Sequence, residues 1–162
     1  MPETFDLLLK GGTALLPGLT TIADIGVREG RIAALGDLSE AQARETIPCR
    51  GLHVLPGVID TQVHFREPGL THKEDIEHGS MAAAAGGVTA FFEMPNTNPL
   101  TTTPEEFARK MNIAAENSYV DYAFYFGGTK NNASMLGEWE NLPGVCGIKI
   151  FMGSSTGDLL SA

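Results

Sequence analysis

The chain has 162 residues, of which 43% are hydrophobic and 19% are charged, a composition typical of globular proteins. Its formal net charge of −9 argues against a nucleic-acid partner, because phosphate binding requires a basic surface. No apolar stretch is long enough to span a bilayer, MPETFDLLLK does not resemble a signal peptide, and Cys49 and Cys146 lack a metal-binding spacing. We therefore expect a cytoplasmic protein that acts on a small molecule or another protein, without membrane or nucleic acid.

Residues 1–52 are predicted to form a small β-sandwich portion. FDLLLKGG is a short apolar run closed by glycines, and residues 22–35 have the pattern of a hairpin that turns at Glu29-Gly30. SEAQARETI is polar and indicates a short helix or loop before a last strand. No helix of ordinary length is evident in this part of the chain.

From residue 53 onward the texture changes to strands that alternate with helices. HVLPGVID, VTAFFEMPN, VDYAFYFGGT and VCGIKIFMG are continuous apolar runs, as buried parallel strands are. The intervening segments predict three helices, in THKEDIEHGSMAAAAGG, TPEEFARKMNIAAENS and NASMLGEWENL. Thr71 with Glu74 predicts a capping box for the first helix, whereas Thr103 and Pro104 predict the start of the second.

This β-α-β-α-β-α-β order predicts a parallel sheet with right-handed crossovers. Polar groups gather just after the strands, where a (β/α)8 barrel keeps its active site. A whole barrel takes about 250 residues, so only about four β/α units fit here. The predicted fold class is therefore α/β, with residues 53–162 as the first half of a TIM barrel that follows the β-sandwich portion.

The stretch VIDTQVHFREPG ends its strand in a group of polar residues. If the strand persists, alternate side chains share a face, and Asp60, Gln62, His64 and Arg66 point the same way. His64 is a candidate metal ligand through its neutral imidazole. Two histidines in the spacing H-x-H at a strand end would give two nitrogens to one metal ion. Here Gln62 stands in the place of the first histidine, and its neutral amide oxygen is a weak zinc ligand. On this stretch alone, a hydrogen-bonded histidine at a strand end, with Gln62 as its polar neighbour, is the favoured interpretation.

Lys149 favours the interpretation of His64 as part of a metal site. It lies inside VCGIKIFMG, a strand with no other charge. A buried lysine is disfavoured as a cation, so its free amine becomes nucleophilic and can take up carbon dioxide to form a carbamate. A carbamate offers two oxygens that can bridge two metal ions. The alternative is a lysine whose stem is buried and whose ammonium reaches the rim.

Two further residues suit the binding of an anion. Arg66 carries a planar guanidinium that binds a carboxylate through two hydrogen bonds. Asn96, in EMPNTNP, follows the second barrel strand and offers an amide N–H to the same group. A surface salt bridge for Arg66 and a turn-forming role for Asn96 stay open as alternatives.

PGVIDTQVHFREPG, GGVTAFFEMPNTNP and GIKIFMGSSTG together resemble dihydroorotase of the amidohydrolase superfamily. The resemblance implies one or two zinc ions that His64 and a carbamylated Lys149 bind, with Gln62 as a doubtful ligand. It also implies that Arg66 and Asn96 hold the carboxylate of dihydroorotate while its ring opens to carbamoyl aspartate in pyrimidine biosynthesis. Arg66 favours this substrate, since the related hydantoinases and allantoinases lack an arginine at this place.

The family takes two further histidines and a catalytic aspartate from later strands, and the chain ends before them. We therefore expect the N-terminal part of a longer enzyme, inactive by itself, that assembles as a homo-oligomer. A hydantoinase- or allantoinase-type cyclic amidohydrolase is the first alternative. The second is a non-catalytic pseudo-dihydroorotase that binds aspartate transcarbamoylase, an interpretation that Gln62 favours.

Overall fold

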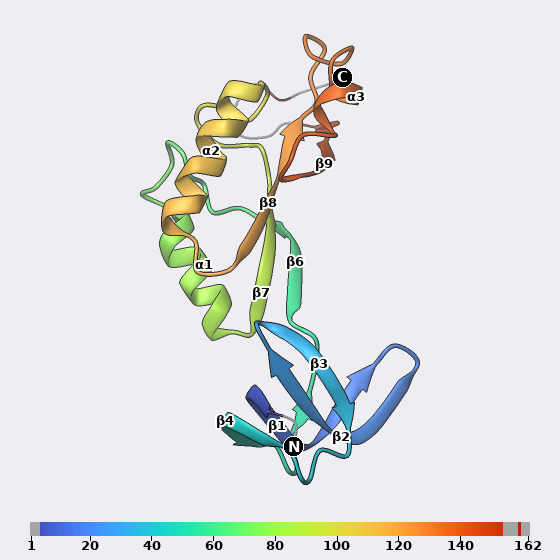
Figure 1. Ribbon diagram of the computed structural model, residues 1–162. Coiled ribbons are helices and arrows are strands. Elements are labelled where there is room, and N and C mark those ends of the chain that lie inside the picture. The colour runs from blue at the N-terminus through green and yellow to red at the C-terminus, as the bar shows by residue number, and fades with distance from the viewer. Residues whose placement is uncertain (1–3, 154–158, 160–162) are drawn as a thin grey trace. The chain divides into compact units, whose positions relative to one another are not determined.

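The computed structural model describes residues 4–153 and residue 159, and the chain divides into two compact units, Met1–Pro56 and Gly57–Ala162. Figure 1 shows the elements of both units. The described strands of the first unit are β1 (Thr4–Leu16), β2 (Leu19–Arg28), β3 (Arg31–Gly36), β4 (Gln42–Pro48) and β5 (His53–Val54). Its all-β character agrees with the sequence.

The described strands of the first unit form one five-stranded sheet in the order β3-β2-β1-β4, with β5 also paired to β1. The predicted hairpin is present, because β2 and β3 are antiparallel and Val27 pairs with Ile32. Its turn residues Glu29 and Gly30 both have positive φ, 52° and 71°, as a type I′ turn requires. Most of SEAQARETI is strand β4, which lies parallel to β1, so the helix or loop expected there is limited to the residues before Gln42.

The second unit alternates strands and helices along the chain. Its described elements are β6 (Val58–Val63), α1 (Ile76–Ala85), β7 (Val88–Glu93), α2 (Pro104–Asn117), β8 (Asp121–Gly127), α3 (Leu136–Trp139) and β9 (Val145–Lys149). Within the described residues, the strands form a parallel four-stranded sheet in the order β6-β7-β8-β9. The predicted alternation is therefore confirmed, and α1 and α2 pack against one face of this sheet (Figure 1).

The run HVLPGVID is two strands and not the one buried strand that the sequence predicts. β5 pairs with β1 in the first sheet, whereas β6 pairs with β7 in the second. Pro56 lies between them and lacks the N–H that a continuous ladder needs. β6 is also less buried than expected, since Val58 and Ile59 are 53% and 54% exposed.

The helices begin where side chains satisfy their first N–H groups. α1 begins at Ile76 and not at the predicted Thr71, because Asp75 is its N-cap and accepts a hydrogen bond from the His78 N–H at 2.7 Å. α2 begins as predicted, with Thr103 as N-cap and Pro104 as its first residue. The third helix, α3, is only four residues long. No helix in the described part of the chain is long and apolar enough to cross a membrane.

An aromatic core joins α1 and α2 to the sheet. Phe107 of α2 stacks on Phe126 of β8 with their ring centroids 4.7 Å apart. The rings of Phe65 and Phe91 meet edge to face at the same spacing. The buried residues of this cluster are Ile76, Phe91, Phe107, Ala114, Phe124 and Phe126. Because this face of the sheet is well packed, it fixes the ends of the strands that carry the polar groups.

Candidate functional site

His64 lies directly after β6, at the carboxyl end of the parallel sheet. Its Nδ1 is 2.9 Å from Oδ1 of Asn96, which follows the end of the neighbouring strand β7. Because a carboxamide oxygen only accepts hydrogen bonds, Nδ1 carries the proton and donates it. Nε2 therefore keeps its lone pair, which is the form in which an imidazole binds a metal ion.

The surroundings of His64 keep its imidazole neutral. Burial lowers its pKa below the usual 6.5, and the nearby cations of Arg66, Lys149 and Lys110 lower it further, while the hydrogen bond to Asn96 acts in the opposite direction. The balance favours the uncharged ring. Together with the fixed position of the Nδ1 proton, this makes His64 a suitable metal ligand.

The predicted alternation of polar side chains from residue 60 to residue 66 does not extend that far. β6 ends at Val63, and its register against β7 shifts between Asp60 and Val63, so that two residues of β6, Thr61 and Gln62, lie opposite one residue of β7. Asp60 Oδ1 accepts the Gln62 N–H at 3.0 Å, which removes this donor from the ladder. Gln62 is exposed next to the bulge.

Arg66 adopts an unusual backbone conformation just beyond His64. Its φ is +65°, in the left-handed region that residues other than glycine seldom adopt. Its Nη1 atom is buried and has no hydrogen-bond partner in the described part of the chain. Since an unpaired buried donor is costly, this nitrogen is a candidate for binding an oxygen of a ligand.

Lys149 is the last residue of β9 and pairs with Gly127, the last residue of β8. Because the strands are parallel, Lys149 and His64 lie at the same end of the sheet, and the charge of Lys149 acts on the imidazole. Lys149 is partly buried, not fully buried as the sequence suggests. Its Nζ lies 5.1 Å from the centroid of the Phe151 ring, a cation–π contact. The rest of the GSSTG motif, from residue 154, lies outside the described residues.

A buried ion pair behind this end of the sheet was not predicted from the sequence. Lys110 Nζ of α2 lies 3.0 Å from Glu93 Oε2 at the end of β7, and the two side chains are 0% and 1% exposed. Both positions carry a signal in the sequence. Glu93 is a charge inside the apolar run VTAFFEMPN, and Lys110 lies on the stripe that Phe107 and Ala114 mark on α2.

Burial and attraction act against each other in this pair. Burial raises the pKa of Glu93 to about 7, whereas Lys110 and the Arg66 backbone N–H lower it. Burial also lowers the pKa of Lys110, and the carboxylate of Glu93 raises it. A buried pair survives only with further hydrogen bonds, and Lys110 makes two, to the Met94 carbonyl and to Thr101 Oγ1.

The segment 94–101 connects this ion pair to the candidate site. Its buried residues are Met94, Pro95, Asn96, Thr97 and Thr101. The carbonyl of Pro95 accepts the N–H groups of both Thr97 and Thr101 at 3.0 Å, which folds the segment on itself. The Asn98 N–H donates to the Pro68 carbonyl at 2.9 Å, so the segment also holds the loop that follows His64.

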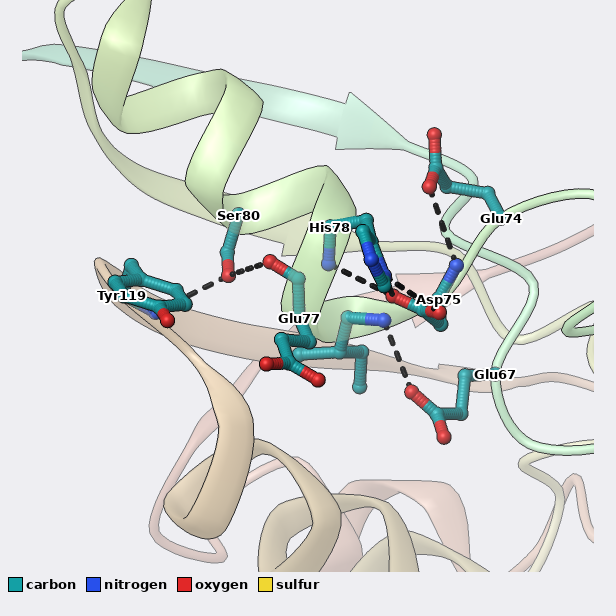
Figure 2. A network of polar contacts seen from close by, with 8 residues as sticks. Glu67, Glu74, Asp75, Glu77, His78, Ser80 and Tyr119 are labelled. Atoms are coloured by element: carbon teal, nitrogen blue, oxygen red, sulfur yellow. Dashed lines mark hydrogen bonds and ion pairs between the residues drawn. The ribbon is translucent and has the colours of Figure 1, made fainter.

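The same loop is tied to the start of α1, as Figure 2 shows. Glu67 Oε2 accepts the Ile76 N–H at 2.9 Å, so a side chain from the FREPG motif caps the helix. Asp75 Oδ1 accepts from both the backbone N–H and the Nδ1 of His78. Ser80 further along α1 accepts the Tyr119 N–H at 3.1 Å. The loop between His64 and α1 is therefore fixed at both ends.

The described residues contain no group of three or more histidine, cysteine, aspartate or glutamate side chains that could hold a metal ion. His64 still fits a metal site, because Asn96 orients its ring and leaves Nε2 free. Lys149 fits it only as the carbamate. His64 and a carbamylated Lys149 therefore stay candidate metal ligands, and Gln62 is the weakest candidate.

Comparison with known proteins gives a consistent picture. Residues 51–130 match a family described as Dihydro-orotase-like. The chain is 46% identical over 158 residues to an allantoinase of Rubrobacter xylanophilus, which covers 96% of the chain and 34% of that protein. It is 41% identical over 153 residues to an allantoinase of Deinococcus radiodurans, with coverage of 94% and 34%. The chain spans about one third of the length of these relatives.

The fold is also similar to that of a solved L-hydantoinase from Arthrobacter aurescens. The TM-score is 0.90 at 35% sequence identity, and the match covers 98% of this chain and 35% of that one. The predicted fold class is thereby confirmed, since the parallel sheet and the β-rich unit correspond to the N-terminal part of a hydantoinase-like barrel. These relatives are named allantoinase and hydantoinase, and they therefore favour the alternative of a hydantoinase- or allantoinase-type enzyme over dihydroorotase.

Proposed function

We propose that this chain, a relative of the cyclic amidohydrolases of the amidohydrolase superfamily, forms part of an enzyme that opens the ring of allantoin or a related hydantoin. The observation that carries the proposal is the position of His64, with its Nδ1 proton held by Asn96, at the same end of the sheet as Lys149. The names of the relatives, allantoinase and hydantoinase, support allantoin or a hydantoin as the substrate over dihydroorotate.

The proposed reaction is hydrolysis of a ring amide. The oxygen of water attacks the carbonyl carbon, the bond from that carbon to the ring nitrogen breaks, and the nitrogen takes up a proton. The product is an open-chain carbamoyl acid with a new carboxylate. A divalent metal ion, for which zinc is our expectation, polarises the carbonyl and lowers the pKa of water when it is bound.

The residues of this chain have distinct proposed roles. His64 Nε2 and the carbamate of Lys149 hold the metal. Arg66, with its buried Nη1, binds an oxygen atom of the substrate, and the carboxylate of dihydroorotate would also satisfy this contact. Asn96 orients His64, a role that its 2.9 Å contact supports, alongside its proposed donation to the substrate.

The test is a substrate panel on the protein that contains this chain, at the full length of its relatives. We expect kcat/KM for allantoin or a 5-substituted hydantoin to exceed that for dihydroorotate by at least about tenfold, which corresponds to about 1.4 kcal/mol. Turnover should be lost in His64→Asn and kept in His72→Asn, because His72 is exposed. A preference for dihydroorotate would restore the interpretation that the FRE motif suggested.

Gln62 gives a second test of the metal site. Gln62→His places an imidazole two residues before His64, and we expect the affinity for zinc to rise at least about tenfold, because imidazole is the better ligand. Equilibrium dialysis with zinc measures this affinity, with Thr61→His as the control. Equal affinities in the two variants would remove residue 62 from the ligand set.

Gln62 also favours one non-catalytic candidate. In this second proposal the chain lacks a strong metal ligand at residue 62 and is a non-catalytic partner of aspartate transcarbamoylase; assembly as a homo-oligomer is a separate expectation. Both partners stay predictions. Absence of bound zinc and of turnover on every ring in the panel, together with co-purification of that enzyme, would support this second function over the first.

A further inference from the structure

The segment that carries Asn96 is anchored by a side chain from α2. Lys110 Nζ lies 3.0 Å from Glu93 Oε2, 3.0 Å from the Met94 carbonyl and 3.3 Å from Thr101 Oγ1. Lys110 thus donates two hydrogen bonds and forms one ion pair, since neither carboxylate oxygen of Glu93 has a hydrogen-bond partner in the described part of the chain. These contacts lie at the two ends of the segment 94–101, so a buried cation fixes where the segment begins and where it ends.

Asn96 lies inside this segment, two residues after Met94, and is only 5% exposed. Its Oδ1 faces His64 Nδ1. A displacement of the segment would therefore move the acceptor that selects the imidazole tautomer. The tautomer decides which ring nitrogen offers a lone pair, so the position of this acceptor has a chemical consequence.

We propose that Lys110, paired with Glu93, is a positioning residue that holds Asn96 in place and thereby keeps the proton of His64 on Nδ1. The inference deepens the proposed function, because it concerns the histidine assigned there to the metal. A position on α2 outside the sheet thus controls the ring nitrogen that faces the site. Neither side chain forms a hydrogen bond or ion pair with His64 in the described part of the chain, although the charge of Lys110 contributes to lowering the pKa of its imidazole.

A purely structural role for the ion pair makes a different prediction. In that case, loss of Lys110 lowers the stability of the fold, but every molecule that remains folded keeps the same tautomer of His64. The tautomer is visible by NMR, because protonated and unprotonated ring nitrogens differ in 15N chemical shift. It can be measured in the absence of metal and substrate, and so it does not depend on turnover.

The experiment uses the 15N-labelled protein at about pH 8.5, where the imidazoles are neutral. His64→Asn identifies the signals of His64. In the unaltered protein we expect Nδ1 to carry the proton. In the double variant Glu93→Leu with Lys110→Met, which leaves no unpaired buried charge, we expect the Nδ1–H population to fall at least about twofold. Arg109→Met, which removes the exposed neighbouring cation, should leave the population unchanged.

An unchanged tautomer in the folded double variant overturns the proposal. Should that variant not fold, Thr101→Val carries the test, since it removes one anchor of Lys110 and leaves the ion pair in place. An unchanged tautomer of His64 in Thr101→Val would likewise overturn the proposal. Failure of the proposed function is a separate result, because the protein could show the expected tautomer and still open no ring.

Discussion

Two polar networks flank the candidate site, and they differ chiefly in burial. The network at the start of α1 is exposed, with the side chains of His78 and Asp75 66% and 28% accessible (Figure 2). The network under α2 is closed to solvent, with Lys110 and Glu93 at 0% and 1%. Both contain a cation, a carboxylate and backbone groups at similar distances.

The comparison shows that the types of interacting groups do not by themselves determine how much a polar contact contributes to stability. Water competes for the exposed groups and screens their charges, so each contact there is worth little. In the buried network a lost partner leaves an unpaired charge that water cannot reach. We therefore expect the buried network to control the geometry of the whole strand end, and the exposed network to control only the start of one helix.

The largest expected effect is that of removing one member of the buried pair. Lys110→Met leaves the Glu93 carboxylate without its cation, and we expect the free energy of unfolding to fall by about 3–5 kcal/mol. Urea denaturation of the chain measures the loss. The double variant Glu93→Leu with Lys110→Met should recover most of it, since no buried charge remains. A loss below about 1 kcal/mol in Lys110→Met would show that solvent reaches the pair.

The buried network is also the part of the site that sequence reasoning missed. His64 and Lys149 could be assigned to a common strand end, because the order of strands and helices predicts which ends meet. Lys110 could not, because a single lysine on a helix is far more often at the surface. Its partner is distant in sequence, and only the packing of α2 on β7 brings the two side chains together.

The local backbone limits prediction in another way. Val63 and Phe65 pack against the aromatic core. The common face expected for Asp60, Gln62, His64 and Arg66 is interrupted, because the Asp60 carboxylate accepts the Gln62 N–H and the strand bulges between Asp60 and Val63. α1 begins later than predicted for a similar reason. The side chains of Glu67 and Asp75 accept the N–H groups of Ile76 and His78, and so they cap the helix more effectively than Thr71 could. Competition among nearby caps is decided by tertiary contacts that a pattern does not contain.

The exposed network should give a smaller effect. Asp75→Ala removes the N-cap of α1, and we expect a loss of about 1 kcal/mol in the free energy of unfolding. Asp75→Asn is the matched control, because its amide oxygen still caps the helix while the charge is lost. Urea denaturation compares the two variants. A loss in Asp75→Ala as large as that in Lys110→Met would contradict the contrast between the two networks.

The two networks also predict opposite titration of two histidines. The hydrogen bond that His78 donates to the Asp75 carboxylate, together with the charge of that carboxylate, raises the pKa of His78 above 6.5, whereas burial lowers the pKa of His64 below it. The His78–Asp75 contact therefore stabilises the fold fully below pH 6.5, and its contribution is lost as the pH rises through the raised pKa of His78. His64 acts in the opposite direction, because acidification below pH 6.5 protonates the unfolded chain first.

NMR titration of the metal-free protein checks this order. We expect the midpoint of His78 to lie above that of His64, and Asp75→Asn should lower the midpoint of His78 while leaving His64 unchanged. A His64 midpoint above 6.5 would mean that water reaches the imidazole and that burial does not set its charge.

The smallest expected effect concerns the exposed pair beside Lys110 on the same helix. Arg109 Nη1 lies 3.7 Å from Glu106 Oε2, and the two side chains are 56% and 30% accessible. Because the Arg109 side chain is mostly in water and its contact with Glu106 is long, Arg109→Met should change the free energy of unfolding by less than about 0.5 kcal/mol. Lys110→Met introduces the same side chain at the adjacent residue. A difference between the two variants in the loss of unfolding free energy, measured in urea, therefore reports the burial of Lys110. Equal losses would assign the effect of Lys110 to the helix and not to its partner Glu93.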